Sequence, residues 1–109
     1  MIDMEKLDRV LLELGHLDNL SGTDYIRVAV SSYKPGMAIT KELYPLVARL
    51  CMTTGARVER SIRHSIERAW ARNTYDAQAK YFGGTIDPEK GSPTNGECIA
   101  RLWRICRAD

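Results

Sequence analysis

The stretch from Thr53 to Arg72, TTGARVERSIRHSIERAWAR, constrains this chain more than any other part of its sequence. At about 100° per residue it predicts an amphipathic helix. The apolar face holds Val58, Ile62, Ile66 and Ala69, with Trp70 at its edge. The opposite face holds Arg57, Arg60, His64, Glu67 and Arg68. Such a helix packs against a core on one side and presents positive charge on the other.

The positive charge of the chain is concentrated in this helix. Residues 56–72 contain five arginines and two glutamates, a net charge of +3, whereas the whole chain carries +2. The remaining residues therefore sum to −1 (+2 minus +3). A localised cationic face is typical of a surface that contacts phosphates. The ordinary alternative is a solvated face on which Glu59 and Arg63 form an i,i+4 pair.

The residues before this helix favour the first interpretation. Apolar side chains recur at helical spacing between residues 39 and 50, and a short glycine-containing turn, residues 51–55, follows. The apolar positions are Ile39, Leu43, Leu46, Val47 and Leu50. Helix, tight turn and helix form the helix-turn-helix unit, whose second helix enters the major groove of DNA.

Two arginines open the cationic face one turn apart. Arg57 and Arg60 each carry a guanidinium fork that can donate to both acceptors of a guanine. Glu59 lies between them, and a carboxylate near phosphates is unfavourable unless it accepts from a cytosine amino group or pairs with a cation. Both roles stay open for Glu59: reader of a base, or partner of Arg63 within the helix.

The run TTGARVERSIRHSIERAW closely resembles the recognition helix of a known family, whose members read like TTASRVERAIRHAIEVAW. That family is the DNA-binding domain of the master sporulation-initiation response regulator of endospore-forming bacteria. Two further blocks agree in order and spacing. ITKELYPLVA at 39–48 resembles the preceding helix, and PTNGECIA at 93–100 resembles the start of the last helix. The resemblance extends from about Leu7 to Trp103.

The resemblance implies an all-helical domain that binds double-stranded DNA at a short box similar to TGTCGAA. It also implies tandem head-to-tail copies, hence a homodimer on tandem DNA sites, and contact with RNA polymerase. By position, the base readers would be Arg57, Glu59 and Arg60. Arg63 and His64 would contact phosphates or neighbouring bases, and Thr53 and Thr54 the DNA backbone.

This chain departs from the family in two residues and in its length. Ala56 and Gly96 stand where the family commonly has serine. Without a hydroxyl at position 56, Thr54 or Gly55 is left as the helix N-cap, and a lost cap costs ~1 kcal/mol. The family's proteins carry a phosphorylatable receiver domain ahead of this one, whereas here Met1 lies only a few residues before the first helix. The resemblance therefore leaves regulation by phosphorylation open.

Helical periodicity extends through the rest of the chain, which predicts an all-α, six-helix domain spanning residues 1–109. The first helix is marked by Met4, Leu7, Leu11 and Leu14 and ended by Gly15. The second is marked by Ile26, Val30 and Tyr33, with Ser21 and Asp24 spaced as a capping box. In the third, Thr40 is a candidate N-cap, but Pro45 would kink the helix or shift its start to Tyr44.

The C-terminal third predicts two more helices separated by a loop. The fifth helix is marked by Tyr75, Ala79 and Phe82 and closed by Gly83 and Gly84, and residues 87–93 form a loop. The sixth opens with a capping box from Thr94 to Glu97 and buries Ile99, Leu102, Trp103 and Cys106. The aromatic residues assigned to the core are Tyr25, Tyr33, Tyr44, Phe82 and Trp103.

Composition narrows the function class. The cysteines, Cys51, Cys98 and Cys106, lack the CxxC spacing of a zinc site, and His16 and His64 are the only histidines, so we expect buried reduced thiols and no metal or other cofactor. No apolar run approaches the ~20 residues of a membrane helix, and the acidic start does not match a signal peptide, which predicts a cytoplasmic protein without membrane contact. Neither His64 nor Cys51 has an orienting third group in a motif, so we expect no catalysis.

Two alternatives accompany the DNA-binding prediction. Arg101, Arg104 and Arg107 lie along one side of the last helix, either as a solvated face that suits the helix dipole or as auxiliary phosphate contacts. For the whole chain, the rival function is a protein-interaction module. It would bind RNA polymerase or a full-length regulator as an antagonist, or compete for the regulator's DNA sites without activating.

Overall fold

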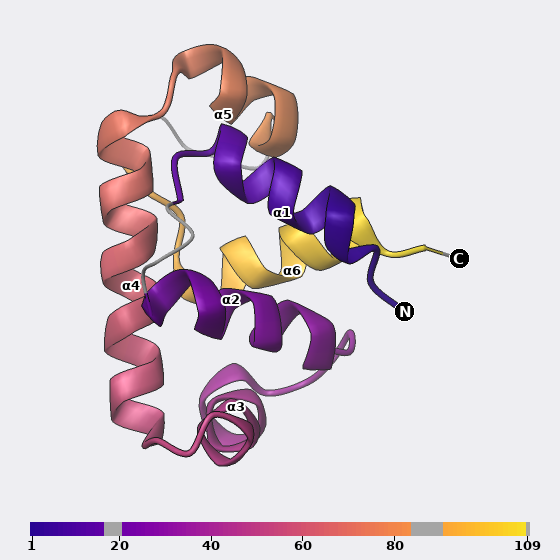
Figure 1. Ribbon diagram of the computed structural model, residues 1–109, viewed down its shortest axis with the longest axis vertical. Helices are drawn as coiled ribbons and strands as arrows, with labels where there is room; N and C mark the ends of the chain where they lie inside the picture. Colours follow the sequence, from indigo (N-terminus) through magenta and orange to yellow (C-terminus); the bar gives the residue numbers. More distant parts are fainter. Residues whose placement is uncertain (17–20, 84–90, 109) are drawn as a thin grey trace.

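A long helix, α4 (Gly55–Arg72), runs along one side of the molecule, and the other helices pack on its inner side (Figure 1). The computed structural model describes residues 1–16, 21–83 and 91–108. Its other elements are α1 (Met4–Glu13), α2 (Ser21–Ser32), a π-helical turn (Ile39–Leu43), α3 (Tyr44–Leu50), α5 (Tyr75–Phe82) and α6 (Asn95–Cys106). Within these described residues no β-strand forms, and Ile2 and Arg107 make an isolated antiparallel bridge. The all-α prediction with six helices is confirmed.

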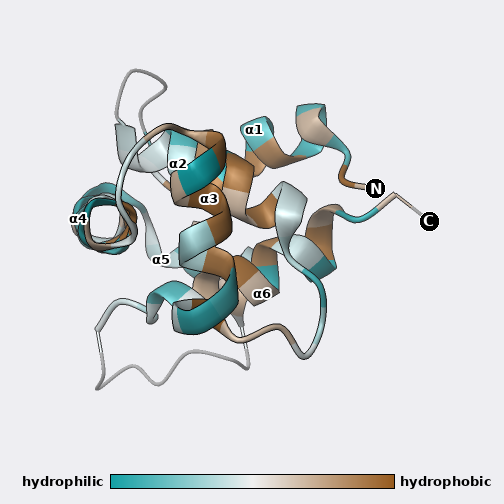
Figure 2. Ribbon diagram, turned by 90° about the horizontal axis from the view of Figure 1, so that it is seen from below, coloured by the Kyte–Doolittle hydropathy of each residue, from teal (hydrophilic) through white to brown (hydrophobic). Residues whose placement is uncertain are grey.

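The apolar face of α4 lies at the centre of the packing. Val58, Ile62, Ile66 and Ala69 are each at most 1% exposed. This face packs against α2, α3 and α6, while α1 closes the core from the side of α2 and α6. In Figure 2, α4 is seen end-on at the edge of the molecule, and hydrophobic residues gather between the remaining helices. The predicted amphipathic helix is therefore confirmed, including Trp70 as a partly buried residue at its edge.

Several predicted helix ends are also confirmed. Helix α1 ends before Gly15, whose φ of 95° lies in the left-handed region that glycine tolerates. Helix α5 ends at Phe82 with Gly83 as its C-cap. Thr94 and Glu97 form the predicted capping box of α6. Gly84 and residues 87–90 of the predicted loop lie outside the described residues.

The predicted capping box of α2 is wrong. Ser21 is the first residue of the helix itself, and no hydrogen bond joins it to Asp24 among the described residues. The Asp24 carboxylate instead accepts from Arg27 at 2.8 Å, because the Arg27 side chain reaches back one turn along the helix. The Ser21 and Asp24 spacing therefore does not form a cap here, and Asp24 forms an ion pair with Arg27 instead.

The start of the third helix follows Pro45. Thr40 is not an N-cap but lies inside the π-helical turn, and regular α-helix begins at Tyr44, the alternative start that Pro45 predicted. In the wide turn the Leu43 N–H donates to the Ala38 carbonyl at 3.0 Å. Widening the turn here relieves the clash between a proline ring and the carbonyl four residues earlier.

The burial predictions hold with four exceptions, because Tyr25, Tyr33, Cys51 and Trp103 are only partly buried. Ile99, Leu102 and Cys106 are buried, whereas Trp103 is only partly buried and packs edge-to-face on Tyr33 at 5.9 Å. Cys98 and Cys106 are buried free thiols, while Cys51 is only partly buried. Burial raises the pKa of Cys98 to about 12, so this thiol stays protonated and unreactive.

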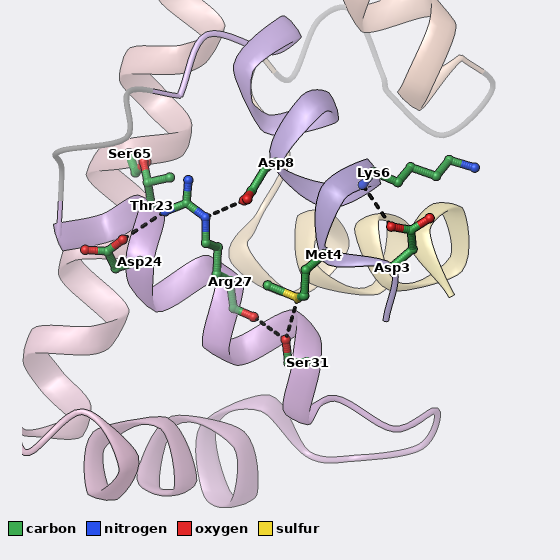
Figure 3. A network of polar contacts seen from close by, with 9 residues as sticks. All are labelled: Asp3, Met4, Lys6, Asp8, Thr23, Asp24, Arg27, Ser31 and Ser65. Carbon is green, nitrogen blue, oxygen red and sulfur yellow. Dashed lines mark hydrogen bonds and ion pairs between the residues drawn. The ribbon is translucent and has the colours of Figure 1, made fainter. Parts of the chain in front are cut away.

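Helix α1 is attached to α2 by one arginine. The Arg27 side chain donates to Asp8 of α1 at 2.5 Å and to Asp24 of its own helix at 2.8 Å (Figure 3). Next to it, the Ser31 hydroxyl donates to the Arg27 carbonyl and contacts the Met4 sulfur. At the far end of α1, the Asp3 N–H donates to the Cys106 carbonyl at 2.8 Å, which joins the start of the chain to the end of α6.

A buried histidine joins the end of α1 to α4. His16 is 1% exposed, and its Nδ1 lies 2.8 Å from the hydroxyl of Ser65, which is also buried. Within the described part of the chain, His16 Nε2 has no hydrogen-bond partner. Burial, with the nearby cations of Arg72 and Arg27, lowers the pKa of His16 from its ordinary 6.5 to about 4. The neutral imidazole is therefore part of the folded state.

Gly22 allows α2 to lie directly on α4 at this junction. A Cβ at position 22 would lie 2.3 Å from the Ser61 carbonyl oxygen, closer than any side chain tolerates.

None of the described helices combines the length and apolar character that spanning a membrane requires. Across the described ranges, no three metal-ligating side chains lie together.

We predict that His16 makes the domain sensitive to acid. Because its pKa is lower in the folded protein than in the unfolded chain, its contribution to stability is complete above about pH 6.5 and is lost as the pH falls towards 4. The slope reaches at most about 1.4 kcal/mol per pH unit. Urea unfolding of wild type and His16→Gln between pH 4 and 7 measures it. The variant should lack this part of the pH dependence, and identical slopes would contradict the prediction.

Candidate nucleic-acid interface

A four-residue turn, residues 51–54, joins α3 to α4, and the two helices pack against each other. In Figure 1, α3 is seen nearly end-on while α4 runs vertically, so the two helices cross steeply. The Thr53 N–H donates to the Ala48 carbonyl at 2.9 Å, and the Met52 N–H approaches the Arg49 carbonyl at 3.4 Å. These bonds form a Schellman motif, which ends α3 abruptly. The predicted helix, tight turn and helix are thus present.

Met52 occupies the position of that motif where glycine is preferred. Its φ is 57°, in the left-handed region, and its side chain is 93% exposed. A side chain with a Cβ is strained at such a φ. Met52 accordingly adds strain to the turn and contributes no packing.

Thr54 caps the start of α4. Its hydroxyl accepts a hydrogen bond from the Arg57 backbone N–H at 3.2 Å. Helix α4 begins at Gly55, one residue earlier than predicted, and Thr54, one of the two candidates, is the N-cap. Thr53 is half-buried and Thr54 exposed, so the first turn of α4 reaches the surface with its cap.

The outer face of α4 carries a row of exposed basic side chains. We define the cationic row as the exposed basic side chains of this face: Arg57, Arg60, Arg63, His64 and Arg68. Glu67 is exposed on the same face. The structure thus brings the base-reading candidates Arg57 and Arg60 together at the exposed start of one helix.

The side chain of Glu59 is paired within α4. Its carboxylate forms an ion pair with the Arg63 guanidinium one turn further along the helix. The side chain of Glu59 remains 37% exposed and that of Arg63 47% exposed. A carboxylate has two oxygens and several acceptor sites, so pairing with Arg63 leaves Glu59 able to accept from another donor.

The backbone carbonyl of Glu59 accepts a hydrogen bond from α6. The Asn95 side-chain amide donates to the Glu59 carbonyl at 3.0 Å and to the Tyr44 hydroxyl at 3.0 Å. Burial raises the pKa of Tyr44, and the hydrogen bond from Asn95 partly opposes that rise. Sequence reasoning used Asn95 only as part of the α6 capping box, so this contact was missed.

Of the three arginines predicted along the last helix, Arg101 and Arg104 lie in α6, whereas Arg107 is its C-cap and has an extended backbone. The Arg101 Nε donates to the Tyr81 carbonyl at 2.6 Å, which holds this half-buried side chain against α5. The Arg107 guanidinium lies 5.2 Å from the Trp103 ring centre. Arg104 is exposed. The Arg101 side chain is therefore held by α5, near the C-terminal end of α4. It does not contact the first turn of α4, where the cationic row begins.

A short helix and a tight turn that present a long cationic helix define the class of helix-turn-helix DNA-binding domains. Comparison with known families agrees with that class. The chain belongs to the family described as the C terminal of the sporulation initiation factor Spo0A, whose family model matches residues 7–105. This is a DNA-binding regulatory family and not an enzyme family. The protein is thus a DNA-binding transcription regulator domain, and the resemblance found in the sequence is confirmed.

We predict that the Thr54 cap contributes to stability. Thr54→Ala should lower the free energy of unfolding by about 1 kcal/mol, because the Arg57 N–H loses its acceptor, whereas Thr54→Ser should stay near wild type. Urea unfolding of the three proteins makes this comparison. If serine destabilises as much as alanine, the hydroxyl is not the stabilising group.

We predict that the strain at Met52 can be removed. Met52→Gly should be more stable than Met52→Ala by about 1 kcal/mol, because only glycine adopts the left-handed conformation without a steric penalty. Both variants lose the exposed side chain, so alanine is the matched control. A glycine variant no more stable than the alanine variant in urea unfolding would show that the turn is not strained.

Proposed function

We propose that this domain is a sequence-specific regulator that places α4 in the major groove of a TGTCGAA-like box. The observation that supports this most directly is the division of α4 into a buried apolar face and the exposed cationic row. A helix presented in this way matches the recognition helix of helix-turn-helix proteins, whose first turns contact base edges. Localised positive charge on that helix also attracts the DNA backbone.

In this proposal the first two turns of α4 read the bases. Arg57 and Arg60 donate to guanines, and the exposed Glu59 carboxylate accepts from a cytosine amino group while it keeps Arg63 beside it. That pair makes the two roles of Glu59 compatible, because Arg63 offsets the repulsion between a carboxylate and nearby phosphates. Reader and intrahelical partner are then one arrangement.

The remaining contacts position the domain on the backbone. Arg63 and His64 contact phosphates or neighbouring bases. Thr53 and Thr54, just before α4, contact the DNA backbone. Arg101 and Arg104 are auxiliary phosphate contacts. The bond from Arg101 to Tyr81 uses one of the five guanidinium donors and leaves the others for a phosphate.

Tandem copies supply affinity that a single small domain lacks. Two domains that contact each other on adjacent boxes bind as a unit, so the second box is bound at a high effective concentration and no new contacts to DNA are needed. We propose a homodimer on such tandem sites, with RNA polymerase as the partner through which transcription changes. The rival function, a protein-interaction module, predicts that the cationic row is dispensable for binding its partner.

The decisive experiment is fluorescence anisotropy on a duplex with two tandem TGTCGAA-like boxes and on a scrambled duplex, at two salt concentrations. A specific regulator should prefer the cognate duplex by about 10³-fold or more and keep that preference at higher salt. Weak, equal binding to both duplexes that disappears with salt would reduce the cationic row to an electrostatic surface. It would then favour the interaction module.

Two variants separate base reading from phosphate contact in the same assay. Arg57→Ala should cost ~1–3 kcal/mol on the cognate duplex and relax the preference at one base pair. Arg63→Ala should weaken binding to both duplexes and reduce the salt slope by about one, with a smaller additional loss on the cognate duplex because Glu59 loses its partner. Equal losses on cognate and scrambled DNA for both variants would refute the base-reading assignment. A protein partner retained by the double variant Arg57→Ala, Arg60→Ala would support the rival function.

A further inference from the structure

Three helices meet at the side-chain amide of Asn95. Asn95 is the first residue of α6 and is 9% exposed. Its Nδ2 donates to the hydroxyl of Tyr44, the first residue of α3, at 3.0 Å. It also donates to the backbone carbonyl of Glu59 in α4, again at 3.0 Å. One buried amide thus connects both helices of the helix-turn-helix unit to the last helix.

The bond to Glu59 is made to a carbonyl inside a continuous helix. A carbonyl oxygen has two acceptor sites, so the Glu59 oxygen can accept from Asn95 in addition to its helical partner. Glu59 lies between Arg57 and Arg60. The bond therefore restrains α4 at the level of the proposed base readers.

The amide itself is held by a well-ordered helix start. Thr94 accepts from the Glu97 N–H at 3.1 Å, and the Glu97 carboxylate accepts from the Thr94 N–H at 2.9 Å. Asn95 lies between these two residues of the capping box, so the box fixes the backbone from which the Asn95 amide projects. The Tyr44 ring on the other side is 7% exposed and has little freedom to move.

We propose that Asn95 is a positioning residue for DNA specificity, which sets the rotation of α4 about its own axis without touching DNA. This inference rests on the proposed function. Hydrogen bonds to base edges require both short distance and good alignment. Contacts to phosphates are less directional, so a small rotation of α4 lowers affinity for the cognate box more than affinity for other sequences.

The chain contains a matched control at the other end of the same helix. Asn73, the C-cap of α4, donates from its Nδ2 to the Leu14 carbonyl at 3.0 Å. Asn73→Ala and Asn95→Ala each remove a side-chain amide that donates to a backbone carbonyl, and neither changes the net charge. The two variants differ in which end of α4 they release.

The experiment compares cognate and scrambled duplexes for the two variants, at a temperature where urea unfolding shows each to be folded. Asn95→Ala should lower the ratio of cognate to scrambled affinity by ~10-fold, with an unchanged salt slope. Asn73→Ala should change that ratio by less than about twofold. Tyr44→Phe, which keeps the bond to Glu59, should lower the ratio less than Asn95→Ala. It also provides the test if Asn95→Ala does not fold.

A second measurement separates this inference from the proposed function. Backbone amide NMR signals of residues 57–60, recorded without DNA, should shift in Asn95→Ala and stay in place in Asn73→Ala. If wild type shows no sequence preference, the proposed function fails, and these signals alone decide whether Asn95 positions α4. Unmoved signals, or an unchanged affinity ratio in a wild type that does prefer the cognate box, would overturn the positioning role.

Discussion

The burial of one face of α4 is the interaction on which the rest of the structure depends. Val58, Ile62 and Ile66 pack against α2, α3 and α6, and removing such side chains from water stabilises a domain by about 1.5–3 kcal/mol each. Because that face is inward, the cationic row must point outward along the whole length of the helix. Hydrophobic packing therefore decides which side of α4 faces the solvent.

Buried polar contacts restrict the orientation of α4 further than apolar packing does. Apolar side chains tolerate small rotations of a helix, whereas a hydrogen bond between buried groups is satisfied over a narrow range of geometry. Two of the polar contacts of α4 lie near its start and its middle: Asn95 donates to its first turns, and His16 contacts Ser65. The first lies behind the proposed base readers, and the second contains a histidine whose pKa is lowered by burial.

The sequence predicted features that arise within one or two helical turns and missed features that need distant neighbours. The faces of α4, the Thr94–Glu97 capping box and the glycine after α1 follow from side chains close in sequence, and all were confirmed. The Ser21 box failed because Ser21 lies within α2 and not before it, and Asp24 forms an ion pair with Arg27. Thr40 failed as a cap because Pro45 converted the preceding turn to a wider one. The base-contact roles of Arg57, Glu59 and Arg60 stay predictions, although the exposure of the two arginines at the start of α4 supports them.

By itself, the sequence determined the helices, the amphipathic nature of α4, the localised charge and, through three blocks that resemble a known family, the family. Helical period, capping and charge are local properties, so they can be read without knowing how the chain folds back. Only the tertiary structure decided that Asn95 reaches Glu59, 36 positions away, and that His16 reaches Ser65, 49 positions away. Such pairs depend on how helices cross, because the same polar side chains would bind water if the packing placed them at the surface.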